Sequence, residues 1–191
     1  MADLETRIAP APAPKASRTR LREFQAGLAE RLRQAATTPS TQSRLAFRIS
    51  GARGERHYLV DLPEAGEIIS VPEITPVPLT KPWFLGLANV RGSLLSVVDL
   101  TLFADEGATI TDKDSRVLAF SPELRFNAGI LVTRMMGLRN IAQLTSDGVS
   151  ESPDADPWVG KRFKDKDGLQ WEELRLVGLA TDERFLQIGI W

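Results

Sequence analysis

Apolar residues in the body of the chain come in short runs, a spacing that is typical of β-strands rather than long helices. These runs hold four to seven residues, contain many β-branched side chains, and are bounded by glycine, proline or polar residues. They predict strands at 45–49, 57–62, 68–71, 94–98, 117–120, 129–133, 138–144 and 171–174, and a short helix near 185–188. The glycines of the segment 51–54 predict a hairpin between the first two strands. The pattern as a whole predicts an all-β, barrel-like fold.

The first 41 residues follow a different pattern. Residues 1–16 are rich in alanine and proline and hold too little apolar surface to pack, so we expect a disordered tail. Within residues 17–41 we expect an amphipathic helix and a linker, because four large apolar residues recur at helical spacing: Leu21, Phe24, Leu28 and Leu32. This apolar stripe would pack on the body or bind a partner, and residues 42–191 would form the folded domain.

The chain is organised around the stretch 67–103. Four prolines between residues 72 and 82 fix the backbone and predict a rigid loop. Gly86 would let the chain bend into a strand, and Gly92 would supply a hairpin position that a side chain with Cβ resists. Asp99 would end the next strand, expected to be buried on most of its length, and cap a helical turn over 100–103.

Composition agrees with one globular domain preceded by a tail, since 42% of the 191 residues are hydrophobic and 26% are charged. The net charge of −1 provides no excess of basic groups for a nucleic-acid partner. No cysteine is present, which excludes thiol chemistry and is compatible with a reducing compartment. With no export pattern and no apolar run of about 20 residues, we expect a cytoplasmic protein without membrane insertion.

Candidate chemistry is sparse. His57 is the only histidine, so a histidine-based metal site, a catalytic triad or a phosphorelay site would depend on it alone, and we expect it to be structural. The acidic segment 165–168 fails the register of a calcium loop, and residues 160–161 lack the pattern of a phosphate loop. We therefore expect no catalytic residue, cofactor or metal site; a small β-barrel enzyme using Asp61 with Asp99 stays as an alternative without a recognisable base or nucleophile.

The motif W-x-x-G-x-A-N-V-R-G at 83–92, followed by apolar residues and the D-L of 99–100, resembles the signature of CheW-like chemosensory adaptors. The adaptor-like domain of CheA kinases shares this signature, but 191 residues leave no room for a kinase domain beside it. The resemblance implies two small, intertwined SH3-like β-barrels with a hydrophobic seam between them.

The resemblance also implies a non-catalytic scaffold that couples a methyl-accepting chemoreceptor to a CheA-type histidine kinase at membrane-associated receptor arrays. The form of the motif at 83–92 is similar to the family branch found in type IV pilus systems, which drive twitching motility. A coupling protein of flagellar chemotaxis is the alternative within the family.

Five residues are candidates for the partner interface: Glu67, Arg91, Asn89, Gly86 and Trp83. Glu67 opens one strand and Arg91 closes another, and we expect apolar neighbours to shield both partly from water. In CheW-like proteins the matching glutamate and arginine are paired and associated with adaptor interactions, although such a pair can also simply join two strands. Trp83 can be core or interface, and Gly86 fits a requirement of the fold better than a contact.

Overall fold

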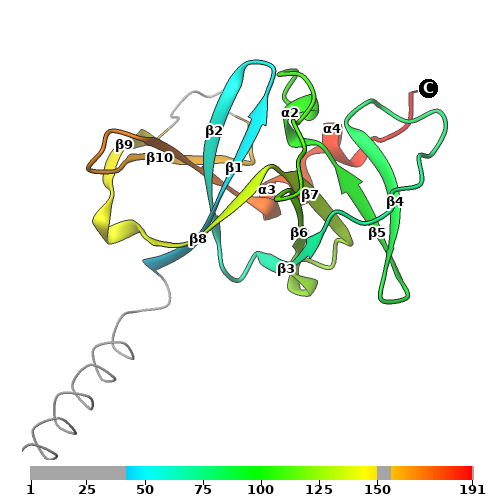
Figure 1. The fold of residues 1–191 in the computed structure, drawn as a ribbon, viewed down its shortest axis with the longest axis horizontal. Coiled ribbons are helices and arrows are strands. Elements are labelled where there is room, and N and C mark those ends of the chain that lie inside the picture. The colour runs from blue at the N-terminus through cyan, green and yellow to red at the C-terminus, as the bar shows by residue number, and fades with distance from the viewer. Residues whose placement is uncertain (1–41, 150–155, 191) are drawn as a thin grey trace, which may run out of the picture. The chain divides into compact units, whose positions relative to one another are not determined.

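A computed structural model of the chain describes residues 42–149 and 156–190 (Figure 1). The expected tail at 1–16 and the expected helix and linker at 17–41 lie outside the described residues. Among the described helices, none has the length and apolarity needed to span a membrane.

The described strands form two mixed sheets. The first has the order β8-β1-β2-β11-β10-β9, and the second has the order β3-β6-β7-β5-β4. The strands of the first sheet are β1 (Ser43–Gly51), β2 (Gly54–Asp61), β8 (Arg134–Asn140), β9 (Thr145–Val149), β10 (Val159–Lys164) and β11 (Gln170–Leu174). Those of the second are β3 (Ala65–Ser70), β4 (Phe84–Val90), β5 (Ser93–Val98), β6 (Arg116–Phe120) and β7 (Ala128–Val132).

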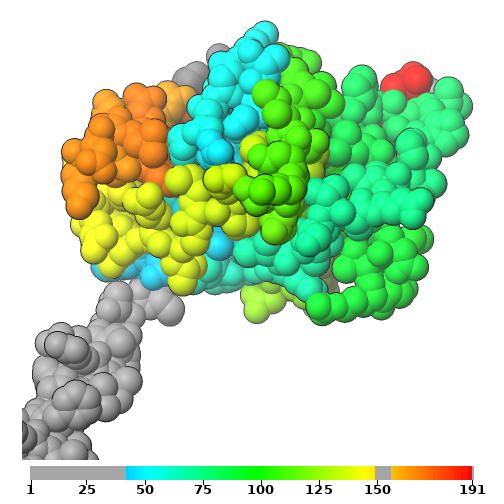
Figure 2. Space-filling view, in the orientation of Figure 1, coloured from blue at the N-terminus to red at the C-terminus, as the bar shows by residue number. Residues whose placement is uncertain are grey.

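The chain interweaves the two sheets. It starts in the first sheet with the β1–β2 hairpin, builds the whole second sheet, and returns to the first sheet for β8 to β11. Figure 2 shows the result on one face, where the cyan β1–β2 hairpin lies between the yellow and orange strands and the green segments. Each sheet contains one parallel pair, β2 with β11 and β5 with β7. Parallel neighbours need a crossover connection, so these pairs tie distant parts of the sequence together.

In the described chain, short helices lie between strands or follow the last strand. Those between strands are α2 (Leu100–Phe103), η2 (Pro122–Leu124) and η3 (Ile141–Gln143), and those after β11 are α3 (Leu176–Thr181) and α4 (Glu183–Leu186). The helix α2 begins where the Asp99 carboxylate accepts hydrogen bonds from the amides of Thr101 and Leu102, so the predicted cap is confirmed. The helix α3 has no side-chain cap of its own. Instead, Glu64 accepts a hydrogen bond of 2.5 Å from the amide of Leu176.

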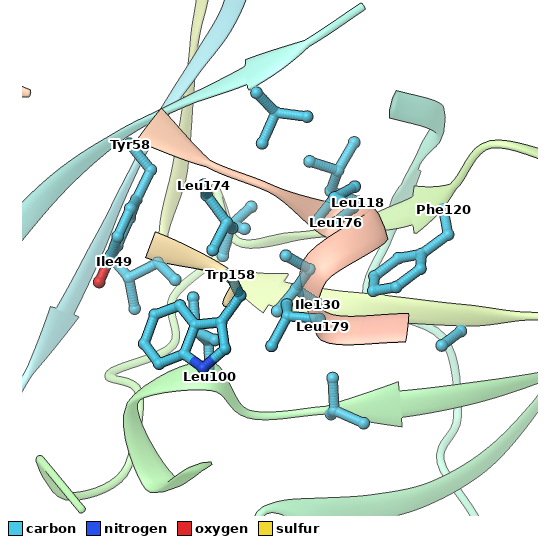
Figure 3. Packing of buried hydrophobic residues seen from close by; sticks show 14 of the residues in the cluster. Ile49, Tyr58, Leu100, Leu118, Phe120, Ile130, Trp158, Leu174, Leu176 and Leu179 are labelled. Carbon is cyan, nitrogen blue, oxygen red and sulfur yellow. The ribbon is translucent and has the colours of Figure 1, made fainter. Parts of the chain in front are cut away.

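Alternation along the strands divides the buried residues into three clusters. Val97 and Val98 are adjacent in β5, point to opposite faces, and belong to different clusters. One cluster draws only on the second sheet and its connections, and another only on the first sheet and its connections. The largest lies between the sheets, where Figure 3 shows residues from both sheets and from α3 around Trp158. The expected hydrophobic seam is therefore confirmed, and with it the all-β fold of two intertwined subdomains.

Several local expectations need correction. The strand expected at 68–71 runs from Ala65 to Ser70, and β5 is less buried than expected, with Leu94 62% exposed. The strand expected at 138–144 is displaced to Arg134–Asn140, because the Asn140 side chain accepts a hydrogen bond from the amide of Ala142 and starts η3. The β1–β2 hairpin and the last strand at 171–174 are confirmed.

Candidate partner-binding site

The turn between β4 and β5 carries the most distinctive backbone of the site. Val90 pairs with Ser93, and the two residues between them, Arg91 and Gly92, have φ angles of 53° and 86°. Two successive left-handed residues define the type I′ turn, whose twist matches that of the flanking strands. Glycine suits its position, as predicted, whereas a long side chain in this conformation costs about 1–2 kcal/mol. Arg91 is therefore held in an unfavourable conformation by the turn around it.

Asn89 supports the same turn. Its side-chain oxygen accepts a hydrogen bond of 2.9 Å from the amide of Gly92. This bond links the last part of β4 to the turn, so the turn is stabilised without the Arg91 side chain. Asn89 thus fixes the conformation from which Arg91 projects.

Arg91 forms an ion pair with Glu67 on β3, with 2.7 Å between Nη2 and Oε1. β3 and β4 are the two edge strands of the second sheet, so the pair joins the tip of the β4–β5 hairpin to the opposite edge. A bridge between Thr75 and Leu87 connects the same parts of the chain further along. The pairing expected from the resemblance is therefore present in the structure.

The expected shielding of the pair is wrong. The Arg91 side chain is 79% exposed and the Glu67 side chain 44% exposed, because Arg91 projects from a hairpin tip beyond the apolar residues of its strand. An exposed pair contributes only about 0–1 kcal/mol to stability. This contribution does not exceed the cost of the left-handed arginine, so stability alone does not account for the residue at this position.

Exposed aliphatic side chains accompany the pair along the sequence. Ile68 and Val71 follow Glu67 and are 42% and 40% exposed, and Leu94 follows the turn. Sequence reasoning missed their exposure, because each belongs to an apolar run and a run of this kind does not reveal which member faces outward. Partly exposed aliphatic side chains of this kind are common in protein interfaces.

Trp83 and Gly86 lie apart from the hairpin tip. Trp83 is 7% exposed and stacks on Phe185 at a centroid distance of 5.2 Å, within the cluster between the sheets. Gly86 has a φ of 137°, and a Cβ there would overlap the backbone carbonyl of Thr75. The structure thus brings Glu67, Asn89 and Arg91 together, and assigns Trp83 to the core and Gly86 to a close approach of two backbone segments.

The alternative acid pair is not assembled. The Asp99 carboxylate is 2% exposed and accepts hydrogen bonds from the amide and hydroxyl of Thr109 as well as from α2. Asp61 instead forms an ion pair with Arg44 at 3.3 Å. Asp99 therefore acts as a structural acceptor. Within residues 42–149 and 156–190, no group of three or more acidic, histidine or cysteine side chains could hold a metal ion.

His57 lies in the first sheet, away from the hairpin tip. Its Nε2 is 3.1 Å from a carboxylate oxygen of Glu55, and its ring makes an edge-type contact with the Trp171 ring at 5.1 Å between centroids. The side chain is 10% exposed, and this burial lowers the pKa of His57 despite the opposing effect of Glu55. These contacts are those of a packed structural histidine.

Comparisons with known proteins find relatives of this chain. The family model "CheW-like domain" matches residues 45–180 of the chain. The protein PilI of Pseudomonas aeruginosa is 34% identical over 98 residues, which are 51% of this chain and 52% of that protein. The chain therefore aligns with about half the length of this curated relative.

A solved structure shares the fold. The scaffolding protein TtCheW from Thermoanaerobacter tengcongensis superposes with a TM-score of 0.56 and 21% identity, over 70% of this chain and 88% of that one. The match at 45–180 spans both sheets and includes Glu67, Asn89 and Arg91. The chain belongs to the CheW-like domain family.

Proposed function

We propose that this chain is a non-catalytic adaptor that couples a methyl-accepting chemoreceptor to a CheA-type histidine kinase. The observation that carries the proposal is the Glu67–Arg91 pair, which a CheW-like fold presents at an exposed hairpin tip. The proposal places the protein in the cytoplasm, at receptor arrays. The similarity to PilI favours the chemosensory pathway that controls type IV pili and twitching motility.

Arg91 is the residue best suited to contact a partner. Its guanidinium is largely exposed and presents a planar set of donors to carboxylates or carbonyls. Glu67 holds this fork in place, and Asn89 holds the turn beneath it. We propose that Glu67, Asn89 and Arg91 form the directional part of the interface, with Ile68, Val71 and Leu94 as its apolar part.

Trp83 and Gly86 take an indirect part in this proposal. Trp83 fixes the second sheet to the α4 region, and Gly86 lets the 72–76 segment approach β4 closely. Both keep the hairpin in a fixed position relative to the rest of the domain. Because the two subdomains share one apolar seam, a receptor on one surface and a kinase on another would be held in a fixed geometry.

Binding measurements with three variants test the proposal. The kinase and the cytoplasmic part of the receptor, both from the same genome, are titrated against Arg91→Ala, Glu67→Ala and the reversal Glu67→Arg with Arg91→Glu. We expect each variant to weaken binding to at least one partner, by a free energy of about 1–3 kcal/mol. The reversal restores an ion pair within the chain but presents the wrong charge to a partner, so it should not restore binding.

Arg125→Ala is a matched control. Arg125 is also exposed and has a φ of 51°, but it follows η2 and lies outside the site. Arg125→Ala makes the same exchange at a left-handed backbone position but leaves the Glu67–Arg91 pair intact, so it should leave binding unchanged. If all three site variants bind both partners as the wild type does, the interface proposal is wrong; if Arg91→Ala unfolds, the pair has a structural role instead.

A deletion strain tests the pathway separately. If the protein acts on type IV pili, loss of the gene should impair twitching motility while swimming persists. Lost swimming with intact twitching would assign the adaptor to flagellar chemotaxis instead.

A further inference from the structure

A cleft opens in the first sheet, between the beginning of β2 and the beginning of β11. Its volume is about 650 Å³. The described residues that line it come from β2, from β9 and from the β10–β11 hairpin: Glu55, Arg56, His57, Asp147, Arg162, Phe163, Leu169, Gln170, Trp171 and Glu172. The cleft belongs to a different sheet from the Glu67–Arg91 pair, so a binding role for it goes beyond the proposed function.

The strand register explains why the cleft exists. Along its other edge, β2 pairs with β1 over its full length, from Gly54 to Asp61. Towards β11, however, the parallel ladder includes only Tyr58 and Leu59 of β2. The four residues 54–57 therefore have no strand partner on this side among the described residues, and the cleft lies along them.

Hydrogen bonds of β1 show which backbone groups face the cleft. The carbonyl of Arg48 accepts a hydrogen bond from the amide of Thr133, and the carbonyl of Ser50 accepts one from the amide of Ile110. Both carbonyls therefore point away from β2. Residues opposite each other in an antiparallel pair either exchange both hydrogen bonds or both turn away from the shared ladder. Arg48 lies opposite His57 and Ser50 opposite Glu55, so the backbone groups of Glu55 and the amide of His57 point into the cleft, whereas the carbonyl of His57 lies at the start of the parallel ladder with β11.

Unpaired backbone groups along a strand edge are a template for another strand. We propose that this cleft binds an extended segment of a partner protein, which adds to β2 as a strand. The main chain of the segment would pair with Glu55 and with the amide of His57. Recognition of this kind takes its affinity from backbone hydrogen bonds and its specificity from pockets for alternate side chains.

The side chains around the cleft define the segment further. Leu169 is 36% exposed and Phe163 8% exposed, and both line the cleft, where they supply apolar surface for one inward-facing side chain of the segment. The carboxylates that line the cleft are already neutralised within the chain: Glu55 by Arg48, Asp147 by Lys164, and Glu172 by Arg56 and Arg162. The charge of the cleft is thus balanced, and the complementary segment carries little net charge and one large apolar residue.

Hydrogen exchange of the free, full-length protein tests the open edge directly. The amides of Arg56 and Tyr58 point into the ladder with β1, whereas those of Glu55 and His57 point into the cleft. We expect the amides of Glu55 and His57 to exchange at least about tenfold faster than those of Arg56 and Tyr58. Equal protection of all four amides would show that the edge is already covered and would overturn the proposal.

Selection from a phage library of random linear peptides tests the binding itself. Selected peptides are synthesised and titrated against the full chain and two variants, His57→Pro and His57→Ala. Proline removes the cleft-facing amide without removing a donor from the β1 ladder, whereas alanine removes only the side chain. We expect His57→Pro to weaken peptide binding about tenfold relative to His57→Ala, since one hydrogen bond is lost.

Two outcomes of this titration contradict the proposal. One is that no selected peptide binds the full chain; the other is that the selected peptides bind both His57 variants equally. The thermal unfolding of the two variants is recorded in parallel. If His57→Pro does not fold, the hydrogen-exchange comparison on the wild-type protein still decides between an open and a covered edge.

Discussion

Replacing Arg91 by asparagine should separate binding from stability. Asparagine followed by glycine is the preferred sequence of a type I′ turn, and the φ angles of 53° and 86° at residues 91 and 92 are those of this turn. The change relieves a left-handed arginine, which costs about 1–2 kcal/mol. It also removes an exposed ion pair worth about 0–1 kcal/mol. We therefore expect Arg91→Asn to leave the free energy of unfolding unchanged or to raise it by about 1 kcal/mol.

Urea unfolding and partner titration give the two readouts. A gain of about 1 kcal/mol corresponds to about 2–4 °C in the melting midpoint of a domain of this size. The same variant should bind a kinase or receptor partner at least about tenfold more weakly, because the guanidinium fork is gone. Arg125→Asn is the matched control: it makes the same exchange in the same backbone conformation, and should keep full binding. A marked loss of stability in Arg91→Asn, or unchanged binding to both partners, would refute this reasoning.

Three further predictions concern the fold around the site. Gly86→Ala should lower the free energy of unfolding by about 2–4 kcal/mol, because its Cβ would overlap the carbonyl of Thr75. Gly92→Ala has open space around it and should lower the same free energy by only about 1–2 kcal/mol, a difference that urea unfolding measures. In the same assay, Asp99→Ala should lower the free energy of unfolding by about 3 kcal/mol, because the buried amides of Thr101 and Thr109 lose their acceptor. Asp99→Asn keeps one acceptor oxygen and should lose less stability. Burial lowers the pKa of His57, so its contribution to stability is present above about pH 6.5 and is lost as the pH falls through the folded-state pKa. Thermal unfolding from about pH 7.5 to about pH 5.5 should therefore show a smaller loss of stability in His57→Phe than in the wild type.

Sequence patterns were sufficient where neighbouring residues decide the structure. The β1–β2 hairpin, the cap at Asp99 and the turn at Gly92 depend on residues that are close in the chain, and all three are confirmed. The pairing of Glu67 with Arg91 came from the resemblance to CheW-like adaptors. Their exposure could not be predicted in this way, because it depends on how far the β4–β5 hairpin extends beyond the rest of the sheet.

Elements fixed by distant residues were missed. The β10 segment VGKRFK shows little alternation, and its position is set by pairing with β9 and β11. The α3 segment LVGLAT contains a glycine and reads as an apolar run rather than as a helix. Its first turn is capped by Glu64, which is 112 residues earlier in the chain. No local signal in either segment indicates these partners.

The interwoven chain path has a consequence for how an adaptor of this kind can work. Adjacent residues such as Val97 and Val98, or Val117 and Leu118, serve different clusters, so each of these strands of the second sheet is packed on two sides. A displacement of such a strand would disturb both the interior of its own sheet and the seam shared with the other sheet, and close packing strongly resists such changes. The hairpin with Arg91 in the second sheet and the cleft beside His57 in the first are therefore separated by rigidly packed strands. Partners bound at these two places would be coupled through fixed geometry rather than through a conformational change within the domain.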